Sequence, residues 1–469
     1  MSGTEIVRPV DGSTITRIPI AGSADVDRAF LAAQQAQPAW GETPPTERGR
    51  ILRRVEALML DRVEELAAVE SENTGFPISA CRAMARRAAG TFGFFGGYAD
   101  KVLGSTIEVD TDYHVYTRRE PFGTVVAIVP WNAPLIFATK KIAPAIAFGN
   151  ACILKPAAES PLTALLLADI MAEAGVPEGV AQIVTGERET GSLLTSDPRA
   201  DLIVFTGSDA TGKHVARAAA ENLVPVALEL GGKSPQIVFD DADLDRALEW
   251  VMLGIYSETG QACIAGSRLL LQDSVHDEFL DRLARETERL RVGDPADADT
   301  AVGPQMTKTQ QQKTLGMIER ALEAGARRVA SAPLPRDPRL AEGFFVPPTV
   351  FADVDLRSEL MRDEVFGPVI AAARFSDEAE AIALANDTRF GLAAGIWTGD
   401  LGRAHRVARS VRAGNVYLNS YFEVSDQVPF GGMGMSGFGR EGGQSAIDLY
   451  TQVKTVWTSM HTPASKTTR

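Results

Sequence analysis

The chain has 469 residues, of which 45% are hydrophobic and 23% charged, and its formal net charge is −14. This composition is typical of a folded globular protein and excludes a disordered chain, while the acidic charge argues against nucleic acid or an anionic membrane as the main partner. At about 100–200 residues per domain, the length predicts two to four domains.

Three cysteines (Cys81, Cys152 and Cys263) are too few for a disulfide scaffold. The N-terminal segment lacks the apolar stretch and the arginine-rich pattern of targeting peptides. Prolines and Asn132 interrupt the most apolar stretch, residues 123–139, so no transmembrane helix is expected. We therefore expect a cytoplasmic protein with no membrane or nucleic-acid partner.

The first predicted element is a single long helix over residues 46–73. Thr46 is its expected cap, and Asn73 to Gly75 is its expected end. Apolar residues recur on one face at helical spacing: Ile51, Val55, Leu58, Met59, Val63 and Leu66. This helix is interpreted as scaffold without chemistry.

Strands and helices alternate after residue 122. The first set predicts strands over 123–130, 151–156, 180–186, 201–208 and 225–232, with helices over 135–148, 161–175 and 209–222. The second set predicts strands over 235–240, 267–272, 370–375 and 394–398, with helices over 243–258, 274–291, 377–386 and 400–412. Such alternation with continuous apolar strands predicts an α/β fold of two parallel sheets, each covered on both faces.

Two strand-like segments, residues 113–120 and 450–457, continue neither alternation. They predict a separate strand pair that reaches toward a neighbouring subunit.

Cys263 is the best candidate nucleophile, because it follows Gly260-Gln261-Ala262 and small neighbours leave it accessible. Cys81 and Cys152 are interpreted as buried apolar residues. None of the five histidines lies in a site-like stretch, and no cluster has metal-ligand spacing, so neither a cysteine protease nor a metal site is predicted.

Two polar residues stand at expected strand ends. Glu229 lies between Leu228 and Leu230, where partial burial would raise its pKa toward the range of a general base. The alternative is a carboxylate bound by backbone donors. Asn132 follows the strand over 123–130, and its amide is suited to stabilising an oxyanion, although a turn asparagine between two prolines is the alternative.

Two further strand ends indicate phosphate binding. Gly207 permits a tight turn after the strand over 201–208, and Ser208 with the first N–H groups of the next helix could hold a pyrophosphate. Lys155 ends another strand. Because open parallel sheets bind ligands at the carboxyl ends of their strands, we expect Lys155, Ser208 and Glu229 at one ligand site.

Seven short blocks in order resemble the aldehyde dehydrogenase superfamily over nearly the whole chain. They are PWN at 130–132, LKP at 154–156, FTGS at 205–208, LELGGKSP at 228–235, GQAC at 260–263, EVFGP at 364–368 and PFGG at 429–432. The resemblance implies an oxidoreductase that converts an aldehyde to a carboxylic acid with NAD, NADP being possible.

The resemblance also implies roles for the matching residues. Cys263 attacks the aldehyde, Asn132 and the Cys263 backbone N–H hold the oxyanion, and Glu229 activates the water that hydrolyses the thioester. The implied cofactor-binding residues are Lys155 at the adenine ribose, Gly207 and Ser208 at the pyrophosphate, Glu364 at the nicotinamide ribose, and Phe366 and Trp131 near the nicotinamide.

The resemblance divides the chain into three parts. An NAD(P)-binding domain comprises residues 1–102 and 122–231, and a catalytic domain comprises residues 232–430. An oligomerisation arm comprises residues 103–121 and 445–460, followed by a flexible tail over 461–469. Relatives are usually dimers or tetramers, so a homo-oligomer is expected.

One departure from the family bears on the cofactor. Many NAD-preferring relatives have a glutamate three residues after the ribose lysine, whereas this chain has Ala158 there and Glu159 next. A carboxylate at that place would repel a 2′-phosphate, so NADP is expected to be accepted beside NAD.

The expected substrate is a bulky apolar aldehyde, aromatic or long and branched, rather than acetaldehyde or a charged semialdehyde. Relatives that take small aldehydes often have large side chains at the positions of Ala133 and Ser257, and the remaining expected walls are Phe137, Tyr256, Phe422 and Val424. No arginine lies beside Asn132 or before Cys263 to bind a substrate carboxylate, whereas Glu423 and Asp426 would suit a cationic substrate if they face the tunnel. Two alternatives stay open: a CoA-acylating enzyme, and a non-catalytic scaffold on the same fold.

Overall fold

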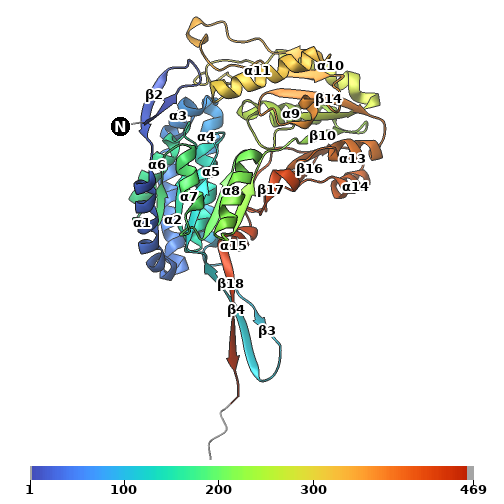
Figure 1. Cartoon of the computed structure of the whole chain (residues 1–469). Coiled ribbons are helices and arrows are strands. Elements are labelled where there is room, and N and C mark those ends of the chain that lie inside the picture. Colours follow the sequence, from blue (N-terminus) through green and yellow to red (C-terminus); the bar gives the residue numbers. More distant parts are fainter. Residues whose placement is uncertain (1–2, 462–469) are drawn as a thin grey trace, which may run out of the picture.

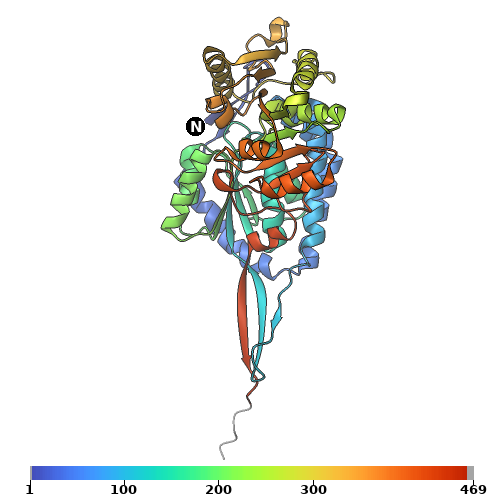
Figure 2. The same ribbon diagram turned by 90° about the vertical axis from the view of Figure 1, so that its right-hand side faces the viewer.

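The computed structural model describes residues 3–461. The chain forms a two-lobed body from which a narrow β arm projects, as Figures 1 and 2 show from two directions. The predicted architecture of two parallel sheets and a small β arm is therefore confirmed. The tail expected over residues 461–469 lies outside the described residues apart from its first position.

The N-terminal region comprises one hairpin and four helices. Strands β1 (Gly3–Val7) and β2 (Thr14–Pro19) pair antiparallel, and α1 (Ser23–Glu42), α2 (Pro45–Asp61), α3 (Val63–Thr74) and α4 (Ile78–Tyr98) follow.

The prediction of one helix over residues 46–73 is wrong, because the chain breaks at Arg62 between α2 and α3. Met59 and Val63, on either side of the break, are both buried, so the apolar spacing does not reveal it. The first helix also begins at Pro45 rather than after Thr46, because proline at the first helical position needs no N–H partner.

The first lobe contains a six-stranded sheet of order β17-β9-β8-β5-β6-β7. Strands β5 (Thr124–Ile128), β6 (Ala151–Lys155), β7 (Ala181–Ile183), β8 (Leu202–Thr206) and β9 (Val226–Glu229) are parallel, and the short β17 (Gly437–Phe438) pairs antiparallel with β9.

Helices cover both faces of this sheet. One apolar core joins it to α2, α4, α5 (Pro134–Ala147) and α6 (Leu162–Glu173), and the other joins it to α1, α7 (Arg188–Ser196) and α8 (Asp209–Glu221). Neighbouring residues of one strand, such as Val125 and Val126, face opposite cores, which explains why these strands are apolar throughout.

The second lobe contains a seven-stranded sheet of order β12-β13-β14-β11-β10-β15-β16. Its strands are β10 (Pro235–Val238), β11 (Arg268–Gln272), β12 (Arg327–Ser331), β13 (Thr349–Ala352), β14 (Val369–Phe375), β15 (Ala393–Trp397) and β16 (Asn415–Leu418). Only the β12–β13 pair among these neighbours is antiparallel.

Helices α9 (Leu244–Tyr256) and α10 (Asp273–Glu288) cover one face of this sheet, and α11 (Lys308–Glu323), α13 (Glu378–Asn386) and α14 (Leu401–Ser410) cover the other. The short helices α12 (Glu359–Arg362) and α15 (Ser445–Tyr450) complete the body.

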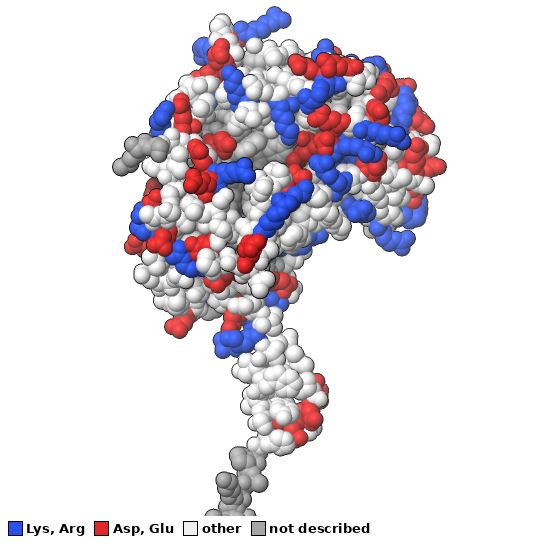
Figure 3. Space-filling model, in the orientation of Figure 1, with Lys and Arg blue, Asp and Glu red and all other residues white. Residues whose placement is uncertain are grey.

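The arm is a three-stranded sheet of order β18-β4-β3, formed by β3 (Thr106–Ile107), β4 (Tyr113–Pro121) and β18 (Thr451–Ser459). The predicted pairing of residues 113–120 with 450–457 is confirmed. Charges of both signs alternate over the body in Figure 3, whereas the visible face of the arm is largely uncharged. Val453 and Trp457 of β18 are exposed.

Within residues 3–461, no helix is long and apolar enough to cross a membrane.

Candidate active site

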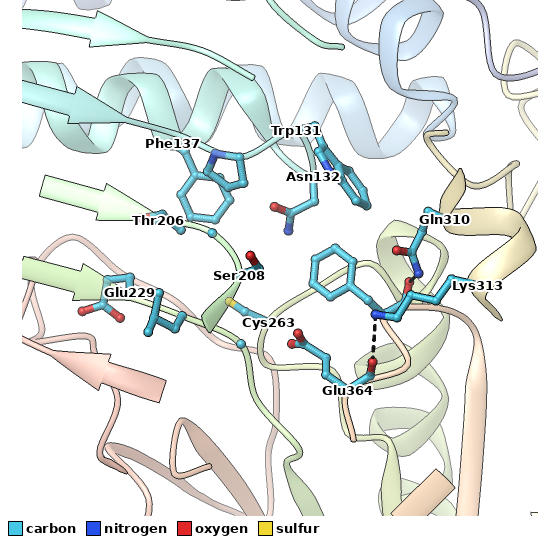
Figure 4. A pocket seen from close by; sticks show the side chains of 15 residues that line it. Trp131, Asn132, Phe137, Thr206, Ser208, Glu229, Cys263, Gln310, Lys313 and Glu364 are labelled. Atoms are coloured by element: carbon cyan, nitrogen blue, oxygen red, sulfur yellow. Dashed lines mark hydrogen bonds between the residues drawn. The ribbon is translucent and has the colours of Figure 1, made fainter. Parts of the chain in front are cut away.

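A cavity of about 200 Å³ lies between the lobes, at the carboxyl ends of β5, β8 and β9. Figure 4 shows its lining. It brings together Asn132, Glu229, Cys263, Glu364 and Phe366, which lie far apart in the sequence. The other lining residues are Pro130, Trp131, Phe137, Thr206, Gly207, Ser208, Leu230, Gly231, Gln310 and Lys313.

Cys263 follows an unusual turn, in which Glu258, Thr259 and Gly260 all have positive φ, at 52°, 55° and 71°. The side chain of the buried Gln261 holds the turn by accepting a hydrogen bond of 2.9 Å from the Met306 N–H. The Cys263 thiol is half-buried at the cavity, whereas Cys81 and Cys152 are fully buried, as predicted.

The Cys263 thiol is neutral in this arrangement. Burial, followed by the negative charges of Glu364 and Glu229, raises its pKa to about 12. A thiol in this state needs a base or a bound cation to become a nucleophile.

Asn132 lies immediately before α5, and its amide faces the cavity near Cys263 (Figure 4). Its Nδ2 donates a hydrogen bond of 2.7 Å to the Gln261 carbonyl oxygen, so it connects the first lobe to the turn that carries Cys263. The start of α5 is fixed by the buried Glu70, which accepts hydrogen bonds from the Leu135 N–H and the Thr163 hydroxyl. Sequence reasoning missed Glu70, since it lies in α3.

Glu229 lies at the end of β9, as predicted, and it is buried. Neither of its carboxyl oxygens has a hydrogen-bond partner among residues 3–461. Burial, and then the negative charge of Glu441, raises its pKa well above its ordinary value. Figure 4 shows its carboxyl group turned away from Cys263. The alternative of a carboxylate bound by backbone donors is therefore wrong.

A buried ion pair between Lys141 of α5 and Glu441 lies close enough to act on Glu229. The two charges have opposite effects on its pKa: Glu441 raises it, whereas Lys141 lowers it. This pair could not be predicted from sequence spacing, because its members are 300 positions apart.

Glu364 and Phe366 form another wall. The Glu364 carboxylate accepts a hydrogen bond of 2.9 Å from the Gly232 N–H, and burial raises its pKa to about 7. Phe366 has a φ of 57°. Gln310 of α11 donates hydrogen bonds of 3.0 Å to the carbonyl oxygens of Val365 and Phe366, which holds this conformation. Lys313 donates to the Glu364 carbonyl oxygen at 3.1 Å, as drawn in Figure 4.

The β8–α8 turn suits a dinucleotide. Ser208 caps α8 by accepting a hydrogen bond of 3.3 Å from the Thr211 N–H, and Gly207 lies in the turn. The buried Thr206 hydroxyl, which lines the cavity, has no partner within the described part of the chain. The rings of Trp131 and Phe366 meet edge to face at 5.2 Å. The N-terminus of α8 and the Thr206 hydroxyl suit a pyrophosphate. The apolar wall formed by Trp131 and Phe366 suits an attached ring.

Lys155 lies apart from this cavity, in a second hollow on the other side of the β8–α8 turn. Its buried Nζ donates one hydrogen bond, of 3.1 Å, to the Pro156 carbonyl oxygen, which leaves donors for ribose hydroxyls. Burial lowers the pKa of Lys155, and the carboxylates of Glu159 and Glu187 partly offset this effect by raising it. The second hollow also contains His214, although no histidine was expected near a site.

Tyr256, an expected wall of the substrate tunnel, and Ser257, an expected small residue that widens it, both lie elsewhere. The Tyr256 hydroxyl is buried and bonded to the Thr287 hydroxyl at 3.0 Å, so its ring belongs to the core of the second lobe. Ser257 lines a separate hollow beside Trp250 and Leu253. Phe137 does line the Cys263 cavity. Phe422 and Val424 are half-buried in the same apolar group as Cys263.

The site combines a half-buried thiol, an amide donor and a buried carboxyl group at the carboxyl edge of a parallel sheet. This combination is typical of a dehydrogenase-like α/β protein with a nucleophilic cysteine. The sequence model of the aldehyde dehydrogenase family matches residues 2–456. The chain belongs to this family, and it is an aldehyde dehydrogenase. Members of the family are NAD(P)-dependent oxidoreductases, so the non-catalytic alternative falls away.

Similar proteins cover nearly the whole chain. The betaine aldehyde dehydrogenase of Sinorhizobium fredii is 44% identical over 458 residues, 97% of this chain and 94% of that protein. A crystal structure of a putative aldehyde dehydrogenase from Burkholderia cenocepacia has a TM-score of 0.96 and 44% identity, covering 97% of this chain and 94% of that one. The crystal structure of PnpE in complex with nicotinamide adenine dinucleotide has a TM-score of 0.97 and 42% identity, covering 99% and 95%.

Proposed function

We propose that this aldehyde dehydrogenase oxidises its substrate by covalent catalysis at Cys263, with NAD as the preferred cofactor and water as the final acyl acceptor. The observation that carries the proposal is the buried, unpartnered carboxyl group of Glu229 beside the cavity of the Cys263 thiol. A buried carboxyl group without partners is costly for folding, and a water-activating base accounts for it.

The first step forms a bond between the Cys263 sulfur and the aldehyde carbon, and the carbonyl oxygen takes up the electron pair. The thiol proton passes to solvent water, and the raised pKa of the thiol makes this loss unfavourable unless a base assists it. The Asn132 amide and the Cys263 backbone N–H donate to the new oxyanion, which is the role of preorganised donors in a dry site. When bound, the nicotinamide ring supplies the hydride acceptor that converts the adduct into a thioester on Cys263.

Glu229 then removes a proton from water as the water oxygen attacks the thioester carbon. The carbon–sulfur bond breaks, the Cys263 sulfur keeps the electron pair, and the carboxylic acid leaves. To reach this water, the Glu229 side chain must rotate from the position in Figure 4. Its raised pKa suits a general base at neutral pH better than an ordinary carboxylate would.

The cofactor would lie across both hollows, on either side of the β8–α8 turn. Lys155 would bind the adenine ribose, Gly207 and Ser208 the pyrophosphate, and Glu364 the nicotinamide ribose, with Phe366 and Trp131 as the apolar wall. In this arrangement, residues 1–102 and 122–231 form the cofactor domain, and residues 232–430 carry the nucleophile.

The substrate would have a bulky apolar or aromatic body, because the small Ala133 leaves room and Phe137, Phe422 and Val424 offer apolar walls. Betaine aldehyde, named for several relatives, is a second candidate. The carboxylates of Glu423 and Asp426 favour it, since they lie in the loop that packs over the second lobe's core.

The exposed apolar strand β18 supports a homo-oligomer, dimer or tetramer, in which the arm (residues 103–121 and 445–460) packs against another subunit. Val453 and Trp457 are 58% and 59% exposed on this strand, and such residues are usually covered by a partner.

Absorbance at 340 nm with a panel of aldehydes tests the proposed reaction. We expect reduction of NAD without CoA, and a kcat/KM for benzaldehyde more than about tenfold above that for acetaldehyde, because burying a ring contributes about 1.5–3 kcal/mol. Turnover only with CoA would favour an acylating enzyme instead. A preference for acetaldehyde would refute the wide tunnel.

A further inference from the structure

Two cations beside the reaction cavity have no ion-pair partner among residues 3–461. They are Lys140 of α5 and Arg87 of α4. The contrast with the next residue is sharp, since Lys141 is buried in an ion pair with Glu441. Lys140 shares a small hollow with Asp426 and Glu441, and Glu441 is already paired with Lys141, so the carboxylate of Asp426 is left to balance the two cations. A bound anion would balance the second charge.

Lys140 faces the substrate side of Cys263. Its Nζ lies 5.2 Å from the centre of the Phe430 ring. Phe430 packs with Tyr417, Phe422 and Cys263 against the core of the second lobe. Phe137, about one turn earlier on α5, lines the Cys263 cavity, and the positive charge of Lys140 acts on the Cys263 thiol. Lys140 lines a separate small hollow, so a molecule bound at this thiol would have to extend beyond Phe137 to meet it.

Arg87 lies farther out, where its side chain is exposed. The positive charge of Arg87 lowers the pKa of Lys140 and that of the Tyr417 hydroxyl. The Cys263 thiol raises the pKa of the same hydroxyl. Thr91, one turn after Arg87 on α4, donates a hydrogen bond of 2.7 Å to Asp426, and Asp426 lines a small hollow together with Lys140 and Phe430. This contact brings α4 close to Lys140.

The nearby carboxyl groups do not neutralise this pair. Asp426 accepts a hydrogen bond of 2.7 Å from the Thr91 hydroxyl and balances at most one of the two charges. Glu441 is occupied by Lys141. Burial raises the pKa of Glu258 to about 7, so that it is partly protonated at neutral pH. Burial, and then Arg87, lowers the pKa of Lys140, and a bound anion would relieve both effects.

We propose that Lys140 and Arg87 form the carboxylate-binding end of the substrate tunnel. The preferred substrate is then an aldehyde with an apolar or aromatic body and a carboxylate remote from the carbonyl group, the semialdehyde of a dicarboxylic acid. This inference rests on the proposed function and narrows it. It disfavours betaine aldehyde, because the Lys140 ammonium, 5.2 Å from the centre of the Phe430 ring, would repel a trimethylammonium group at the same place.

The kinetic test compares 3-carboxybenzaldehyde with its methyl ester, which has the same body and no charge. In the wild-type enzyme, kcat/KM for the acid should exceed that for the ester by about tenfold to a hundredfold, the value of one charge-assisted hydrogen bond. Lys140→Met should reduce this ratio by a similar factor, through a higher KM for the acid, and Arg87→Gln should reduce it less.

Arg86→Gln is the matched control, since Arg86 is also exposed on α4, one position away. It should leave the acid-to-ester ratio unchanged. A ratio that Lys140→Met does not alter would overturn the proposal, and so would a wild-type preference for the ester or for betaine aldehyde.

A second readout needs no turnover. The rates at which iodoacetate and iodoacetamide alkylate Cys263 are compared in the absence of aldehyde, since only iodoacetate carries a carboxylate. Lys140→Met should lower the iodoacetate-to-iodoacetamide ratio at least about threefold, whereas Arg86→Gln should not. An enzyme that oxidises no aldehyde but shows this effect refutes the proposed function alone, and an unchanged ratio in an active enzyme refutes the carboxylate site alone.

Discussion

The seven-stranded sheet and the cavity at the end of the six-stranded sheet bury charge in opposite ways. Arg268, at the start of β11, donates to the carbonyl oxygens of Lys233, Leu384 and Ala385 at 2.9, 2.8 and 2.7 Å. Two of these acceptors belong to the last turn of α13, where a cation is favoured by the helix dipole. Burial lowers the pKa of Arg268 only to about 10, so it stays charged at neutral pH.

Glu229, at the end of β9, is equally buried, but its carboxyl oxygens have no partner within residues 3–461. Burial, and then the negative charge of Glu441, raises its pKa well above the ordinary value of a carboxyl group. This difference distinguishes a structural residue from a site residue. The hydrogen bonds of Arg268 go to carbonyl groups of the fold, whereas the Glu229 carboxyl oxygens, without a partner within residues 3–461, can accept protons in the reaction. Five predictions test this comparison, from the largest expected effect to the smallest.

Cys263→Ala should abolish turnover, because covalent catalysis cannot bypass its nucleophile. The kcat should fall below about a hundredth of the wild-type value, with unchanged cofactor binding by fluorescence titration. Cys81→Ala, which removes a buried thiol away from the cavity, is the control and should retain turnover. Activity of Cys263→Ala above that limit would rule out the assigned nucleophile.

Glu229→Gln should slow steady-state turnover by about 10²–10⁴-fold, the usual contribution of a general base. Hydride transfer should be affected less than hydrolysis, so rapid mixing should show a burst of NADH followed by a slow phase. If the burst slows as much as the later phase, Glu229 acts earlier, for example by taking the proton of the Cys263 thiol.

Arg268→Met should lower the free energy of unfolding by about 3 kcal/mol, because three buried carbonyl groups lose their donor. Urea denaturation measures this loss. Arg409→Met on the exposed face of α14 is the control and should change stability by less than about 0.5 kcal/mol. An equally small change for Arg268→Met would show that its hydrogen bonds do not stabilise the fold.

Ala158→Glu should shift cofactor preference further toward NAD. A carboxylate beside a 2′-phosphate costs about 1–3 kcal/mol, or about tenfold to a hundredfold in kcat/KM for NADP. Wild-type enzyme should prefer NAD and accept NADP, and Ala157→Glu is a control for added charge. More than thousandfold selectivity for NAD in the wild type would identify Glu159 or Glu187, which act on Lys155, as sufficient to exclude the phosphate.

Alkylation of Cys263 by iodoacetamide in the free enzyme should quicken by about tenfold per pH unit between pH 7 and pH 9. The sign follows from the raised pKa of about 12: the thiol form dominates throughout this range, and the reactive thiolate fraction grows tenfold with each unit. A plateau below pH 8 would mean that a base already takes the proton. The Cys263→Ala variant corrects for other cysteines.

The strand ends were predictable from the sequence, because parallel strands are apolar throughout and a polar residue marks where the strand leaves the core. Glu229, Asn132 and Ser208 could be chosen on that basis, and Cys263 could be chosen because small residues flank it after a predicted helix. The order of short family blocks supported the choice. Glu364 and Phe366 depended on the resemblance alone, since their segment otherwise indicates only a turn.

The tertiary structure decided what surrounds those residues. The break at Arg62 was invisible because apolar spacing continues across it, and Tyr256 could not be separated from the tunnel walls because either position buries its ring. Glu70, Gln310 and Arg87 belong to helices that are far from the site residues in the sequence. Lys140 could not be distinguished from Lys141 by sequence, because the ion pair between Lys141 and Glu441 joins distant segments. Local spacing in the sequence determines which residues share a face of a strand or helix. Contacts between distant segments determine which side chains are buried. Burial then decides which charged groups have hydrogen-bond partners and which remain available for chemistry.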